Sequence, residues 1–151
     1  MAIRLVTIIV FAFFISTICA NAQANFLDGR NMEEVYVDRS DGPYVTVTYE
    51  LDLKSNTTKD GITNAFVIAT ISPKSSVPMM IAQTYEIKCS EKLIRFSSAA
   101  SIKSENDKLV MGKWRDRADA EFLNPSTDRG MKAGERGTLK AIITRSCSTE
   151  L

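Results

Sequence analysis

The chain contains no histidine, and this absence removes the side chain used most often in catalysis. Ser-His-Asp and Cys-His nucleophilic sites, histidine general bases and histidine-containing metal sites are all excluded. Carboxylates are the remaining acid-base groups, and the closest sets are Glu33 with Glu34, and Asp116 with Asp119 and Glu121. These residues lie in polar stretches, where solvated surface charge is the expected role. The sequence therefore predicts a non-enzymatic protein with no catalytic residue, cofactor or bound metal.

One short run combines the residue types that dominate binding surfaces. A single tryptophan lies among three cations, and Trp and Arg are enriched in binding hot spots. The candidate contacts for a protein partner are Lys113, Trp114, Arg115 and Arg117. The alternative is that Trp114 belongs to the core while the cations are solvated. Nucleic-acid binding is not expected, because neighbouring carboxylates offset the cations.

Residues 1–24 have the pattern of a secretory signal peptide. A single charge is followed by an apolar run from Leu5 to Ile15 and then by small residues. Cleavage is expected after Ala22 or Ala24, which leaves residues 25–151 as one domain. The apolar run is shorter than the roughly 20 residues that a spanning helix needs, so no stable membrane insertion is expected after cleavage.

Charge and the signal together predict the location of the protein. The full chain has 19 basic and 18 acidic residues, and loss of Arg4 with the signal makes them equal. This balance argues against nucleic acid or anionic membranes as partners. A lipid anchor on Cys19 is not expected, because Ile18 precedes it where a small residue is normal. We expect a periplasmic or secreted protein rather than a surface-attached one.

The cysteines predict a covalent link between distant parts of the chain. Cys19 leaves with the signal, so Cys89 and Cys147 remain in an oxidising compartment and are expected to pair. The chain-entropy model gives roughly 4 kcal/mol of stabilisation for so long a loop. A redox-active pair would have the close CxxC spacing, which these residues lack.

Six stretches have strand-like patterns. From Tyr44 to Leu53 apolar and polar residues alternate, which predicts a strand with one buried face and one solvent-exposed face. Thr63 to Ile71 is denser in apolar residues, as in a central strand covered on both faces. The other four candidates are Glu33–Asp38, Met79–Lys88, Lys92–Lys103 and Lys108–Arg115. In Lys92–Lys103, the residues expected to share one face are Ile94, Phe96, Ser98, Ala100 and Ile102.

The C-terminal stretch from Thr138 to Cys147 predicts a helix. Leu139, Ile142 and Ile143 recur at helical spacing, and Cys147 falls on the same stripe. The preceding residues, 116–137, have no regular pattern. Short connections between the strands favour antiparallel pairing. The predicted fold class is therefore α+β, an antiparallel sheet of about six strands with a C-terminal helix packed on one face and tethered by the disulfide.

These features resemble the surface-adhesin protein E family of bacterial envelope proteins. The likeness rests on Tyr85-Glu86-Ile87-Lys88-Cys89, Arg95 in a basic strand, a glycine-bearing strand, Pro125-Ser126 and a final helix ending in Cys147. It covers nearly the whole mature chain, although Phe122 stands near the place where the family usually has a tryptophan. The resemblance implies a sheet tied to its helix by Cys89–Cys147, and a domain that binds a protein at the cell envelope.

Two functions remain open at this point. An adhesin-like module would contact its partner through the Trp114 region or through an exposed sheet edge. A periplasmic inhibitor or immunity-type protein would block an enzyme, with residues 116–137 as the inserted loop. A homodimer through a sheet edge is a further alternative, because an open sheet leaves two edges.

Overall fold

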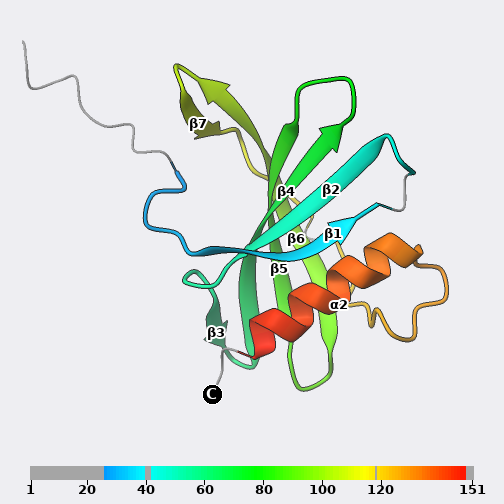
Figure 1. Cartoon of the computed structure of the whole chain (residues 1–151). Coiled ribbons are helices and arrows are strands. Elements are labelled where there is room, and N and C mark those ends of the chain that lie inside the picture. The colour runs from blue at the N-terminus through cyan, green and yellow to red at the C-terminus, as the bar shows by residue number, and fades with distance from the viewer. Residues whose placement is uncertain (1–25, 40–41, 118, 149–151) are drawn as a thin grey trace, which may run out of the picture.

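The computed structural model describes residues 26–39, 42–117 and 119–148, so the predicted signal peptide lies outside the described residues. Within these ranges the chain forms one sheet and a C-terminal helix (Figure 1). The elements are β1 (Met32–Asp38), β2 (Val45–Asp52), β3 (Thr57–Lys59), β4 (Ile62–Pro73), β5 (Met79–Lys88), β6 (Leu93–Glu105), β7 (Lys108–Met111), β8 (Arg115–Asp116) and α2 (Ala133–Cys147). No helix in the described ranges is long and apolar enough to cross a membrane.

The sheet confirms the predicted α+β class. Its strand order is β1-β2-β4-β5-β6-β7, and every pairing is antiparallel. Two short strands add to this path, since β3 pairs with β4 and β8 pairs with β6. β4 lies in the middle and is buried on both faces, as its apolar density predicted.

The helix α2 covers part of one sheet face. Figure 1 shows it lying beside β1, while β7 extends away from it at the far end of the sheet. The side chains between α2 and the sheet form the first core, which consists of Leu51, Ala65, Val67, Tyr85, Ile87, Ile94, Met131, Leu139, Ile142 and Ile143. The predicted stripe Leu139, Ile142 and Ile143 therefore faces the sheet.

The predicted disulfide is present between Cys89, just after β5, and Cys147, the last residue of α2. It tethers the helix to the sheet. The helix begins at Ala133, earlier than the predicted Thr138. Arg136 holds this early start in place by donating hydrogen bonds to the carbonyl oxygens of Asp128 (2.7 Å) and Met131 (3.2 Å).

A bulge in β6 makes one predicted face assignment wrong. Tyr85 pairs with Phe96 and Thr84 pairs with Ser98, so Ser97 is an extra residue in β6. The extra residue reverses the alternation of side chains beyond it. Ile94 and Phe96 consequently face the first core, whereas Ile102 lies on the opposite face of the sheet.

The opposite face carries a second core. Its buried residues are Phe66, Ile68, Ala82 and Ile102, and those packed around them are Phe26, Leu27, Met32, Met80, Leu109, Met111 and Trp114. The segment before β1 and the Trp114 region thus cover this face in place of a helix. This arrangement buries both faces of β4 from Ala65 to Ala69.

Gly137 lets α2 pack closely against the Tyr36 side chain of β1. A Cβ atom at this position would overlap the hydroxyl of Tyr36 and lie 2.5 Å from its Cζ atom. Gly→Ala in a helix normally stabilises by about 1 kcal/mol. Because overpacking costs about 1–3 kcal/mol, we expect Gly137→Ala to lower the free energy of unfolding by about 1 kcal/mol, measured by denaturant titration.

The second substitution in this test is Tyr36→Leu, which removes the ring that Gly137→Ala would meet. In the Tyr36→Leu background, Gly137→Ala should become neutral or stabilising. Equal destabilisation in both backgrounds would show that contact with Tyr36 is not the reason for glycine at this position.

Candidate functional site

A second bulge separates the predicted binding residues onto two faces of the sheet. Met111 pairs with Ile102, and Arg115 pairs with Ala99. The chain from β7 to β8 thus advances four residues where β6 advances three, which places one extra residue in the β7–β8 segment. The predicted single strand Lys108–Arg115 is therefore wrong, because it is interrupted after β7. Bulges re-aim side chains, and this one turns Trp114 to the second core. There its indole packs edge-on against Phe66, with ring centroids 6.3 Å apart.

The exposed cations Lys113 and Arg115 lie together on the helix-bearing side of the sheet. They border a hollow of about 390 Å³ whose floor includes Ile81 and Ala99, and we call it the cationic hollow. Ile81 shares its face of β5 with Tyr85, a first-core residue, and α2 does not extend over it. The hollow thus combines an apolar floor with two exposed positive charges.

Arg117, the fourth predicted residue, does not border the cationic hollow. Its backbone N–H donates to the carbonyl of Ser97 (2.8 Å), and its guanidinium pairs with Asp119 at 3.8 Å. Both side chains are largely exposed, so this ion pair contributes little to stability. The structure therefore brings Lys113 and Arg115 together, and it places Trp114 and Arg117 elsewhere.

Much of the irregular segment 116–137 is held against the sheet. Leu123 and Ile94 exchange two backbone hydrogen bonds of 2.9 Å each. The Phe122 ring contacts both Lys88 and Arg95, each with its cationic group 4.7 Å from the ring centroid. Arg95 is in turn paired with Glu86. These contacts cover the edge of β6 that β7 and β8 leave unpaired.

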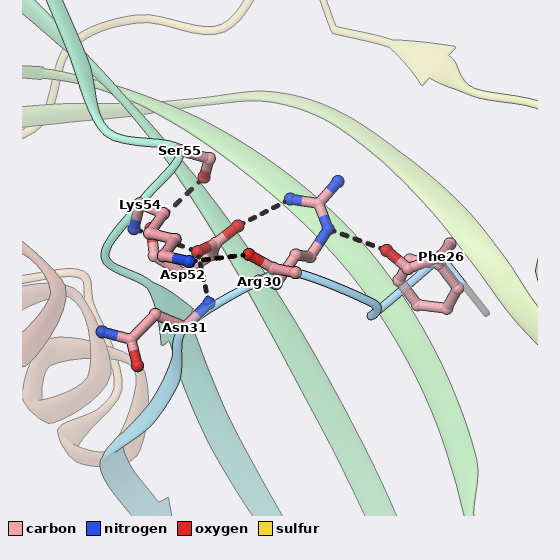
Figure 2. A network of polar contacts seen from close by, with 7 residues as sticks. Phe26, Arg30, Asn31, Asp52, Lys54 and Ser55 are labelled. Atoms are coloured by element: carbon pink, nitrogen blue, oxygen red, sulfur yellow. Dashed lines mark hydrogen bonds and ion pairs between the residues drawn. The ribbon is translucent and has the colours of Figure 1, made fainter. Parts of the chain in front are cut away.

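A buried carboxylate anchors the segment before β1 (Figure 2). Asp52 is only 1% exposed. The prediction that the polar face of Tyr44–Leu53 is solvent-exposed is therefore wrong at the end of this strand. Its oxygens accept hydrogen bonds from the Arg30 guanidinium (2.8 Å) and from the backbone N–H groups of Asn31 (3.1 Å) and Lys54 (3.0 Å). The Arg30 guanidinium also lies 4.0 Å from the centroid of the Phe66 ring.

The ionisation of Asp52 follows from these contacts. Burial alone would raise its pKa, but the hydrogen bonds from Arg30, Asn31 and Lys54 outweigh burial and lower the pKa below its ordinary value. The carboxylate is thus charged at neutral pH, and both of its oxygens accept hydrogen bonds. This network is structural, since it links the N-terminal segment to β2 and to the second core.

A cavity of about 370 Å³ lies between the sheet and the start of α2, and we call it the aromatic cavity. Its apolar lining consists of Tyr49, Tyr85, Ile94, Phe96, Leu123 and Leu139. No motif in the sequence predicted this cavity. Its rings come from three strands, β2, β5 and β6, and only the register of the sheet brings them together.

Tyr85 is the most deeply buried ring of the aromatic cavity. It packs edge-on against Phe96, with centroids 5.7 Å apart, and its hydroxyl donates to Oε1 of Gln83 (3.1 Å). Burial raises the pKa of Tyr85 well above its ordinary value, and the neighbouring Tyr49 and Glu135 raise it further. The phenol therefore stays neutral, and Glu135 is a lining residue of the same cavity.

Comparisons of the chain with protein-family models, with curated proteins and with solved structures give no significant match. Within the described ranges, no group of three or more Cys, Asp and Glu side chains is arranged to hold a metal ion. The function is therefore inferred from the geometry of the cationic hollow and the aromatic cavity.

Proposed function

We propose that the chain is an exported, non-enzymatic binding domain of the surface-adhesin protein E type. In this proposal it contacts an acidic region of a protein partner at the cell envelope through the cationic hollow. The observation that carries the proposal is the bulge after β7, which fixes Trp114 in the second core and leaves Lys113 and Arg115 exposed beside an apolar floor. The resemblance and the Cys89–Cys147 tether support it.

The chemistry of the cationic hollow favours a carboxylate-bearing partner. Isolated surface ion pairs contribute little in water. A partner side chain seated on Ile81 and Ala99 would exclude water from the same place, which strengthens its interaction with Lys113 and Arg115. Arg115 can also bind a carboxylate with two parallel hydrogen bonds.

The alternative function, an inhibitor or immunity-type protein, draws less support from the geometry. It needs a loop that enters the active site of an enzyme, and residues 116–137 were the candidate. The contacts of Phe122 and Leu123 hold the middle of this segment along β6, and Pro125 is buried. We therefore favour binding through the cationic hollow.

Charge reversal tests this function. Immobilised wild-type protein is used to capture a partner from an envelope extract, and the affinity of the purified partner is then measured. We expect Lys113→Glu with Arg115→Glu to weaken binding by at least about tenfold, and added salt to weaken the wild-type complex.

The matched control is Lys59→Glu with Lys108→Glu, two exposed cations on β3 and β7 that do not line the cationic hollow. It should leave the affinity unchanged. Equal effects of the two double variants would mean that net charge alone governs binding and would contradict the assignment of the hollow. A captured enzyme whose turnover is blocked would favour the inhibitor function instead.

A further inference from the structure

The aromatic cavity is distinct from the cationic hollow and has the features of a small-molecule site. Its volume of about 370 Å³ is in the range of small ligand pockets. Three aromatic rings, Tyr49, Tyr85 and Phe96, contribute to its lining. The Tyr85 hydroxyl already has a partner in Gln83, so a ligand entering the cavity meets ring surfaces rather than an unsatisfied polar group.

Charged residues of both signs line the aromatic cavity. Asp38 comes from the end of β1 and Glu135 from the first turn of α2, and Lys132 is the cation among the lining residues. Glu135 forms no ion pair with another described residue. Its negative charge contributes to the raised pKa of Tyr85. Lys132 and Glu135 are both exposed, so both charges lie at the solvent-facing side of the cavity.

We propose that the aromatic cavity binds a small amphipathic organic cation, with an ammonium group carried on an apolar or aromatic body. Aromatic faces attract cations through their quadrupole, most strongly where water is excluded. The body of the ligand packs against Ile94, Leu123 and Leu139, and its ammonium lies toward Glu135. The ring surfaces, with the Glu135 carboxylate beside them, select a cation over a neutral or anionic analogue.

A series of three probes with the same body tests the charge preference. Phenethylammonium, 2-phenylethanol and phenylacetate are titrated into the intact disulfide-bonded protein, and shifts of the NMR signals of Tyr85, Phe96 and Leu139 are followed. We expect saturable shifts with phenethylammonium, binding about tenfold weaker for 2-phenylethanol, and weaker still for phenylacetate.

One substitution and its matched control test whether the bound ammonium lies beside Glu135. Glu135→Gln should weaken phenethylammonium about three- to tenfold and leave 2-phenylethanol unchanged, because only the charge at the cavity is removed. The matched control, Glu91→Gln, removes an exposed carboxylate that does not line the aromatic cavity and should change neither probe. Circular dichroism checks that α2 is intact in both variants.

The inference is overturned by any of three results. These are no saturable shift with phenethylammonium, a neutral or anionic probe that binds at least as tightly, and equal effects of Glu135→Gln and Glu91→Gln. The first result would identify the cavity as a packing defect, and the second as an apolar pocket without charge selection. None of them bears on the cationic hollow, whose test uses Lys113 and Arg115.

Discussion

Replacing Cys89 and Cys147 by alanine is expected to lower the free energy of unfolding by about 3 kcal/mol. The bridge joins residues separated by 58 positions in the sequence. The chain-entropy model gives about 4 kcal/mol for a loop of this length, and residual structure in the unfolded chain reduces that value. A loss of this size is a large fraction of the 5–15 kcal/mol that is typical of small domains.

The helix and the sheet can be followed separately in this experiment. The chain has one tryptophan, and Trp114 packs in the second core on the face opposite α2. Its fluorescence therefore reports on the sheet, whereas far-UV circular dichroism reports on α2. If the disulfide mainly keeps α2 docked, the dichroism signal of the variant will change at lower denaturant concentration than the fluorescence.

Reduced wild-type protein is the control, because it keeps both sulfur atoms and loses only the bond between them. Its free energy of unfolding should equal that of the double alanine variant, apart from the small packing contribution of the two half-buried sulfur atoms. A loss below about 1 kcal/mol in both would contradict a stabilising role for the tether.

The regular elements could be predicted from the sequence because their signals are local. Strict alternation from Tyr44 to Leu53 predicted β2, and the spacing of Leu139, Ile142 and Ile143 predicted the buried face of α2. The disulfide followed from the cysteine count once Cys19 was assigned to the signal. Each of these predictions used residues close together in the chain or a count that leaves one pairing.

The bulges could not be predicted in this way, and they decide the face assignments. A bulge adds one residue to one strand, and the alternation of residue types does not record the change in register. Ser97 in β6 sends Ile102 to the second core, and the bulge after β7 does the same for Trp114. The sequence therefore predicted the candidate binding residues Lys113, Trp114, Arg115 and Arg117 as one group, but not their separation onto two faces.

Contacts between residues far apart in the sequence could not be predicted either. Asp52 occupies a polar position of an alternating strand, and the groups that bury it come from Arg30 and Asn31, before β1. The rings of the aromatic cavity likewise come from separate strands. Pairing register sets both arrangements, and no periodicity within a single strand carries that information.

Asp52→Ala is expected to destabilise the protein by about 3 kcal/mol, because it leaves a partly buried guanidinium and two backbone N–H groups without their acceptor. Asp52→Asn should cost about half as much, since its amide oxygen can still accept from Asn31 and Lys54. The matched control is Glu33→Gln, which breaks an ion pair with Arg145 between half-exposed side chains. It should change stability little.

The pH dependence of the same variants separates charge from packing. The pKa of Asp52 is lowered in the folded protein, so its contribution is complete above about 3.9, the ordinary pKa of aspartate, and is lost as pH falls through the lower folded value. Asn cannot titrate at this position. The stability gap between wild type and Asp52→Asn should therefore be constant from neutral pH to about pH 5 and should narrow below pH 4. A gap that stays constant into strong acid would mean that Asp52 acts through packing alone, and that the charge it shares with Arg30 does not hold the N-terminal segment on the second core.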